Sequence, residues 1–377
     1  MNKKLFVSSI IIMIILAAGC VAAAMAFSQG AVMDEVITEM DNASKAEEMI
    51  ADMTVEEKVG QMFMGCFYSY TPSWETVNDY HLGGVLLFKP SFVNSSKEYL
   101  TSKLAVMDGV CDIAPITSVD EEGGDVVRVS ASTNFRSEPF KSPRTLYAEG
   151  GMDAVIADTH EKNNLLKSIG IDMNLAPVCD ISTDPSDFMY SRSIGLDPQM
   201  TADFAAKSVE ACKEDNMGCS LKHFPGYGAA VDTHIGSAVD NRTLEHLQGN
   251  DIVPFKAAID AGAHSILVSH NTVTAIDSTM PASLSPAVHK ILREDLGFDG
   301  VIITDDLIMG AVTEYGTESE IAVAAILAGN DILCSGDFYT QYYAVLDAVN
   351  NGVITEERIN ESVKRILMLK LQLGVIS

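Results

Sequence analysis

Residues 286–306 read PAVHKILREDLGFDGVIITDD, and this stretch contains the repeating unit of the fold. Its first part, Pro286 to Phe298, has the apolar spacing of an amphipathic helix. After Gly300 comes a continuous apolar run that ends at Asp305 and Asp306. Such a run beside an amphipathic helix is typical of a parallel strand whose two faces are both covered. The stretch therefore predicts a helix followed by a strand that ends in acids.

The same pattern recurs along the chain. Short apolar runs that end in polar or glycine residues lie at Val59–Phe67, Gly83–Lys89, Pro115–Gly124, Met173–Asp180, Gly218–Phe224, Ser265–His270, Gly300–Asp306 and Asn330–Gly336. Helical patterns separate most of them, so the sequence predicts an α/β fold of the (β/α)8 TIM-type barrel class, forming a single catalytic domain over residues 49–377. In the first run, Val59 to Met64 also fits the continuation of a helix. Thr54 with Glu57 predicts a capping box before that run, and Thr355 predicts the cap of the final helix.

The chain has 377 residues, of which 47% are hydrophobic and 20% charged. This composition is that of an ordinary globular protein with a large core. Its formal net charge is −27. So acidic a chain disfavours nucleic acid and anionic membrane surfaces as partners.

The first 26 residues have the pattern of an export signal. Lys3 and Lys4 precede an apolar run that ends in the small residues LAAGC. This ending resembles a bacterial lipobox, in which Cys20 is lipidated and becomes the mature N-terminus. Cleavage after Ala26 and an uncleaved anchor are the alternatives. Residues 27–48 read as a spacer, and every alternative places the body outside the cytoplasm, in contact with a membrane only through the N-terminal lipid or anchor.

Polar side chains stand at the ends of the predicted strands: Asp120, Asp180, Lys222, His223, His270, Asp305 and Asp306. The carboxyl ends of the strands form the catalytic face of a (β/α)8 barrel. This bias therefore predicts an active site at that face.

The segment KHFPGYGAAVDTHIG, residues 222–236, adds an acid and an imidazole to this face. Lys222 and His223 end a strand, and the Pro-Gly break begins a loop that carries Asp232 and His234. A carboxylate that accepts a hydrogen bond from one imidazole nitrogen fixes the tautomer and leaves the other nitrogen to exchange a proton. The pair predicts a general acid/base.

The motifs KHFPGYG, VDEEGGDVVR, NLAPVCD, YSRSIG, PASLS and LREDLGFDGVIITDDLIMGA together resemble glycoside hydrolase family 3, and most closely its β-N-acetylhexosaminidase branch. The resemblance runs from about Met53 to Gly374. It implies an exo-acting retaining enzyme that removes non-reducing-end GlcNAc from peptidoglycan fragments or chitooligosaccharides through a covalent glycosyl-aspartate. Two protein groups and water suffice for this chemistry, so no metal or cofactor is expected.

The resemblance also implies a role for each matching residue. It makes Asp305 the nucleophile, His234 the acid/base and Asp232 the partner that orients His234. It assigns sugar binding to Asp120, Arg128, Arg192, Lys222 and His223. The chain departs from the family pattern at Tyr227, where a histidine is usual, and in the following GAAV, so the loop ahead of the Asp-His pair is altered.

Three other functions stay open at this point. A β-glucosidase or β-xylosidase of the same family is disfavoured by the Asp-x-His loop. A β-GlcNAc phosphorylase, with phosphate as acceptor, is compatible with the pair. A sugar-binding lipoprotein without catalysis is disfavoured by the presence of both Asp305 and His234. The sequence predicts no oligomeric state.

Overall fold

A computed structural model describes residues 33, 37–228, 233 and 238–377. The chain divides into two units, residues 1–51 and 52–377. In the first unit, residues 37–51 are helical, so the described part of the segment expected to be a spacer is a helix. No described helix combines the length and the apolar character that crossing a membrane requires.

The second unit is built on eight parallel strands, which confirms the predicted barrel. In the described part of the chain their order around the sheet is β10-β1-β2-β3-β4-β5-β7-β9. A parallel bridge between Ile303 and Ile332 joins the two end strands and closes the barrel. The strands are β1 Phe63–Phe67, β2 Gly84–Leu87, β3 Ile116–Val119, β4 Met173–Asn174, β5 Gly218–Phe224, β7 Ser265–Val268, β9 Val301–Thr304 and β10 Leu333–Ser335. A separate pair, β6 Val239–Asp240 and β8 Thr272–Val273, lies among the connections.

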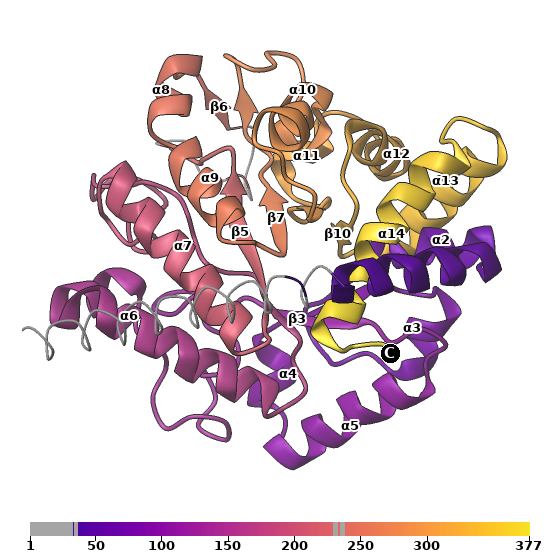
Figure 1. Cartoon of the computed structure of the whole chain (residues 1–377), viewed down its shortest axis with the longest axis horizontal. Coiled ribbons are helices and arrows are strands. Elements are labelled where there is room, and N and C mark those ends of the chain that lie inside the picture. The colour runs from indigo at the N-terminus through magenta and orange to yellow at the C-terminus, as the bar shows by residue number, and fades with distance from the viewer. Residues whose placement is uncertain (1–32, 34–36, 229–232, 234–237) are drawn as a thin grey trace, which may run out of the picture. The chain divides into compact units, whose positions relative to one another are not determined.

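Helices lie between successive strands and cover the outside of the barrel (Figure 1). They are α2 Val55–Gln61, α3 Trp74–Asp79, α4 Lys89–Val93, α5 Lys97–Val110, α6 Pro143–Lys167, α7 Pro198–Glu214, α8 Leu244–Gly249, α9 Ile252–Asp260, α10 Pro286–Lys290, α11 Gly310–Thr313, α12 Glu318–Ala328, α13 Phe338–Asn350 and α14 Glu356–Leu373. A π-helical turn, Ile291–Asp295, extends α10, and a 3-10 turn, Ala282–Leu284, precedes it. The helix predicted from Pro286 onward is therefore present, with a wider last turn.

The ambiguous first run contains both a helix and a strand. Helix α2 begins after Thr54, whose side chain and that of Glu57 form the predicted capping box. The helix ends at Gln61, and strand β1 begins at Phe63. The alternative of a helix that continues through Met64 does not hold, because Phe63 and Met64 pair with the parallel partner β10. Helix α14 begins after its predicted cap, Thr355.

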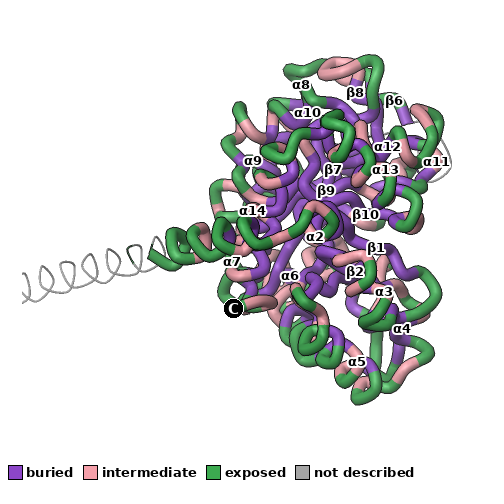
Figure 2. Tube along the Cα trace, turned by 90° about the vertical axis from the view of Figure 1, so that its right-hand side faces the viewer, coloured by how far each residue is buried: buried purple, intermediate pink, exposed green. Residues whose placement is uncertain are grey.

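The apolar strand residues are buried on both faces, as the continuous runs predict. Ile266, Val268 and Ile302 are fully covered. Figure 2 shows the strands as buried and the outer faces of the helices as exposed. Because both faces of each strand are covered, the polar residues that follow the strands lie at the rim of the barrel.

Candidate active site

A pocket of about 410 Å³ lies at the carboxyl ends of the strands. It contains six of the eight residues to which the sequence assigns a role: Asp120, Arg128, Arg192, Lys222, His223 and Asp305. They follow or end β3, β5 and β9 or lie in the long connections after β3 and β4. The other two, Asp232 and His234, lie outside the described residues.

Glu122 holds together two of the three cationic side chains that line the pocket. Its carboxylate accepts two hydrogen bonds from Arg192, from Nε at 2.9 Å and Nη2 at 2.7 Å. The same carboxylate lies 2.7 Å from Lys222 Nζ. Both Glu122 and Lys222 are almost fully buried. The bidentate, charge-assisted contact fixes the planes of the Glu122 carboxylate and the Arg192 guanidinium, so the cations face the pocket in one arrangement.

The charges of this cluster stabilise one another. Burial alone raises the pKa of Glu122, but Arg192 and Lys222 lower that pKa well below its ordinary value. Burial likewise raises the pKa of Asp120, and Lys222 and Arg128 lower it below its ordinary value. Burial lowers the pKa of Lys222, whereas Asp120 and Glu122 raise it. All three groups therefore stay ionised at neutral pH.

His223 is held by Asp180 in one tautomer. Its Nδ1 lies 2.7 Å from Asp180 Oδ2, and its Nε2 lies 3.1 Å from Arg192 Nη2. A guanidinium only donates hydrogen bonds, so Nε2 accepts and Nδ1 carries the proton that it donates to Asp180. Asp180 also accepts the backbone N–H of His223 and that of Tyr227. The imidazole is therefore neutral and fixed in orientation.

Asp120 and Arg128 form the more open side of the pocket. Asp120 accepts a hydrogen bond from Lys222 at 2.7 Å and a longer one from Arg128 at 3.4 Å. The Nε atom of Arg128 is buried and has no hydrogen-bond partner in the structure. An acceptor on a ligand, such as a sugar hydroxyl, satisfies a donor of this kind.

Asp305 and Asp306 follow β9 directly but have different surroundings. Asp305 is partly exposed in the pocket, and one of its carboxylate oxygens accepts the backbone N–H of Asp306 at 2.9 Å. The carboxylate of Asp306 accepts the Tyr68 hydroxyl and the backbone N–H of Gly336. Asp306 thus ties the loops after β1, β9 and β10 together. Both acids line the pocket, and among the described residues the hydrogen bond to the Asp305 carboxylate comes from the backbone alone.

Sequence reasoning missed three residues of this site. The sequence assigned no role to Glu122, yet it anchors Arg192 and Lys222. The sequence placed Asp180 at the rim but assigned it no role. Its position at the end of the run NLAPVCD was the only signal that could have pointed to one. Tyr68 lines the pocket and carried no signal. His270, by contrast, bonds to Ser283 and to the carbonyl of Asp306 and is not among the pocket residues.

Tyr227, one of the positions that depart from the family pattern, contacts the described residue Thr233. Its ring is buried and lines the pocket, and its hydroxyl bonds to both the side chain and the backbone N–H of Thr233. The carbonyl of Thr233 accepts the backbone N–H of Ala311 at 3.1 Å. The residue between the predicted Asp232 and His234 is therefore fixed beside a pocket residue.

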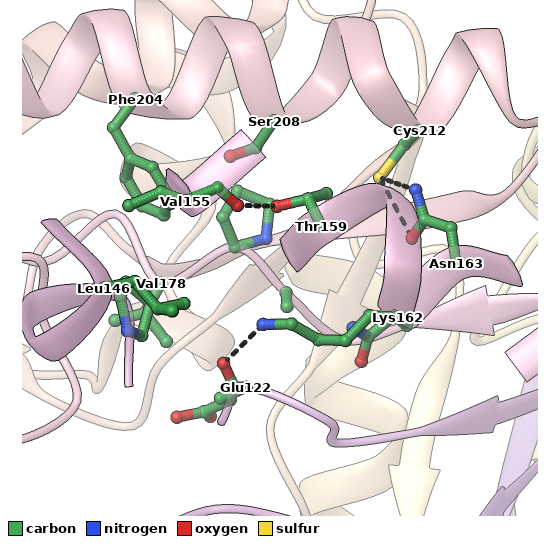
Figure 3. Close-up of a pocket in the computed structure, with 14 residues that line it drawn as sticks. Glu122, Leu146, Val155, Thr159, Lys162, Asn163, Val178, Phe204, Ser208 and Cys212 are labelled. Atoms are coloured by element: carbon green, nitrogen blue, oxygen red, sulfur yellow. Dashed lines mark hydrogen bonds between the residues drawn. The ribbon is translucent and has the colours of Figure 1, made fainter. Parts of the chain in front are cut away.

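A second, smaller cavity of about 30 Å³ lies behind Glu122, between α6, α7 and the barrel wall (Figure 3). Lys162 extends from α6 and donates a hydrogen bond of 3.0 Å to the carbonyl of Glu122. A cavity of this size has room for about one water molecule. The cavity is therefore too small for a sugar, and Lys162 beside it supports Glu122 from behind.

Comparison with known proteins adds to this geometry. Residues 54–369 match the glycosyl hydrolase family 3 N-terminal domain. The chain belongs to glycoside hydrolase family 3. The pocket that holds Asp305 lies within the residues that match this domain.

Curated relatives of this family 3 chain carry a common name. A β-hexosaminidase from Stenotrophomonas maltophilia strain R551-3 is 33% identical over 257 residues, which cover 67% of this chain and 75% of the relative. A β-hexosaminidase from Xanthomonas campestris pv. campestris strain B100 is 32% identical over 256 residues, 67% of this chain and 76% of the relative.

Solved structures agree with the family 3 barrel. A family 3 β-N-acetylglucosaminidase from Paenibacillus sp. FPU-7 superposes with a TM-score of 0.80 and 29% identity over 86% of this chain. This chain spans 63% of that larger protein. A β-N-acetylhexosaminidase from Beutenbergia cavernae has a TM-score of 0.75 and 26% identity over 84% of this chain and 98% of its own.

Acid is expected to destabilise this family 3 barrel through Glu122. The pKa of Glu122 is well below 4.5 in the folded chain and returns to about 4.5 on unfolding. Between these two values the unfolded chain binds a proton that the folded chain does not, so the free energy of unfolding decreases as pH falls. The stabilisation is complete above about pH 4.5 and is lost progressively below it.

Urea unfolding of the wild type and Glu122→Gln at pH 7, 4.5 and 3 measures this effect. Glu122→Gln is expected to lose about 3 kcal/mol at pH 7, because a buried ion pair loses one partner, and to show a smaller decrease toward pH 3. Glu245→Gln, an exposed change on α8, is the control. Equal acid dependence in the wild type and Glu122→Gln would contradict the assignment.

Proposed function

We propose that the chain is an exo-acting retaining β-N-acetylglucosaminidase that removes non-reducing-end GlcNAc from peptidoglycan fragments or chitooligosaccharides. The observation that carries the proposal is the shared pocket, in which the Asp305 carboxylate lies together with Asp120, Arg128, Arg192, Lys222 and His223. The Asp305 carboxylate beside fixed cations and donors suits a sugar ring held by its hydroxyls while its anomeric carbon is attacked. The β-hexosaminidase names of the relatives support the choice of sugar.

In the first step the Asp305 carboxylate forms a bond to the anomeric carbon as the glycosidic C–O bond breaks. His234 donates a proton to the leaving oxygen, with Asp232 stabilising the imidazolium. In the second step His234 removes a proton from water, and the water oxygen displaces Asp305. An imidazole accepts that proton without adding a second anion beside Asp305. The anchoring of Thr233 by Tyr227 supports this part of the proposal, since Thr233 lies between Asp232 and His234 in the chain.

Aryl glycosides test the choice of sugar and acceptor. Hydrolysis of aryl β-GlcNAc is expected to exceed that of aryl β-glucoside and to be unaffected by added phosphate. A preference for the glucoside would contradict the proposed substrate. A product that becomes GlcNAc 1-phosphate when phosphate is added would make the chain a phosphorylase.

We further propose that Cys20 is lipidated and tethers the enzyme to the outer side of the membrane, where it acts on cell-wall fragments. The basic, apolar and small-residue order of the first 20 residues supports this. Expressed in a bacterium with a lipoprotein pathway, the full chain is expected to incorporate an alkyne-labelled fatty acid and to fractionate with membranes. Cys20→Ser is expected to lose the label, whereas Cys111→Ser keeps it. Equal labelling of Cys20→Ser and the wild type would rule out lipidation at Cys20.

A further inference from the structure

Exposed tyrosines gather next to the pocket. Six aromatic side chains are exposed in the described part of the chain, and four of them come from the loop after β1 and the beginning of α13. These four, called the tyrosine platform below, are exposed by 39%, 56%, 38% and 57% for Tyr68, Tyr70, Tyr339 and Tyr343. Contiguous exposed aromatic surface on a globular domain usually marks a binding site.

The platform is a packed surface, since its members share neighbours. Tyr80, which follows α3, packs edge-on against Tyr339 and Tyr343, with ring centroids 5.1 Å and 6.1 Å away. Burial and the adjacent Tyr70 raise the pKa of Tyr339 to about 12. The Tyr339 ring also stacks on Phe338 at 4.0 Å. Packed rings lose little conformational freedom when a ligand binds.

The platform is continuous with the pocket through Tyr68. This side chain lines the pocket, donates its hydroxyl to Asp306, and packs its ring 4.6 Å from that of Phe88, another pocket residue. The Tyr68 ring also lies against Gly336, two residues before α13 begins. A ligand that leaves the pocket beside Asp306 therefore meets Tyr68 and then the rest of the platform.

We propose that the tyrosine platform binds the leaving-group sugars of a neutral β-linked amino-sugar oligomer whose non-reducing end occupies the pocket. This rests on the proposed function, because an exo-acting pocket holds one terminal sugar and the rest of the chain must leave through its mouth. A pyranose presents C–H groups on its faces and hydroxyls at its edge. Tyrosine matches both, with an apolar ring and a polar tip. The platform has four uncharged phenols on a chain of net charge −27, so a neutral glycan fits it better than an anionic polymer.

The kinetic test compares a long with a short substrate on the same sample. The measured quantity is kcat/KM for the β-1,4-linked GlcNAc tetramer divided by kcat/KM for aryl β-GlcNAc. Two lost sugar–aromatic contacts in Tyr70→Ala/Tyr339→Ala are expected to lower this ratio about tenfold. Tyr343→Ala is expected to lower it less. Tyr99→Ala, an equally exposed tyrosine on α5, is the matched control and keeps the wild-type ratio. The ratio cancels any difference in the folded fraction.

Calorimetric titration with the tetramer and with free GlcNAc separates this proposal from the proposed function when every protein also carries Asp305→Asn, which prevents hydrolysis during the titration. A tetramer affinity that falls in Tyr70→Ala/Tyr339→Ala but not in Tyr99→Ala supports the platform. It does so even if aryl β-GlcNAc is not hydrolysed, because absent hydrolysis counts against the proposed function alone. An unchanged ratio and unchanged tetramer affinity in the double variant would overturn the platform. Sedimentation can also overturn the proposal: a dimeric wild type and a monomeric double variant, with the ratio unchanged, would identify the surface as a contact between two copies.

Discussion

The Asp305→Asn variant is expected to lose at least about 10⁴-fold in kcat on aryl β-GlcNAc, because the amide oxygen is a poor nucleophile and no covalent intermediate forms. The fold is expected to persist. The carboxylate oxygen that accepts the Asp306 N–H is replaced by an amide oxygen that also accepts hydrogen bonds. Thermal unfolding and steady-state kinetics on the same preparation measure both properties.

Asp306→Asn is the matched control for this prediction. Asp306 lies one residue away, but its carboxylate accepts bonds from Tyr68 and Gly336 and so joins the rim loops. We expect a smaller loss of activity in Asp306→Asn, together with a lower unfolding temperature. Azide added to Asp305→Ala is expected to yield the α-glycosyl azide, since a small anion occupies the space of the missing carboxylate. Full activity in Asp305→Asn, or an inactive Asp306→Asn with a normal unfolding temperature, would contradict the assignment of the nucleophile.

The second prediction concerns His234, which lies outside the described residues. Loss of a general acid/base commonly lowers the rate about 10²- to 10⁴-fold. We expect His234→Ala to lose this much in kcat/KM on an aryl β-GlcNAc whose phenol leaves poorly. The loss is expected to be much smaller for the dinitrophenyl glycoside, since that leaving group departs without a proton.

His246→Ala is the control for His234→Ala. His246 lies on α8, half exposed and paired with Asp251, outside the pocket. It is expected to keep wild-type kinetics with both leaving groups. Equal losses in His234→Ala for the poor and the good leaving group would show that His234 acts in binding or folding and not in proton transfer.

The fold was predictable because its signal is local. Each of the eight strands appears in the sequence as a short apolar run, and each is present in the structure. The boundaries were less accurate. Strand β4 spans only Met173–Asn174, although the apolar run extends to Cys179 and an isolated parallel bridge joins Val178 to Lys222. Its length is decided by the hydrogen bonds available from β3 and β5, and a single run carries no information about its neighbours.

The candidate site was predictable where a residue ends a strand. Lys222, His223 and Asp305 were placed at the rim on this basis, and all three line the pocket. Glu122 was not, because its role depends on Arg192, which lies 70 positions away in the chain. Tyr68 contacts Asp306 across 238 positions. Contacts of this kind exist only once the barrel has closed.

The sequence by itself determined the barrel and the polar ends of its strands, because apolar periodicity and strand-end chemistry are properties of neighbouring residues, and its motifs carried the resemblance to the family. The tertiary structure alone decided that Glu122 fixes Lys222 and Arg192, that Asp180 fixes the tautomer of His223, and that the platform tyrosines adjoin the pocket. The reason is physical: charge pairing, hydrogen bonding and ring packing act over a few ångströms, and only closure of the barrel brings distant strand ends within that range.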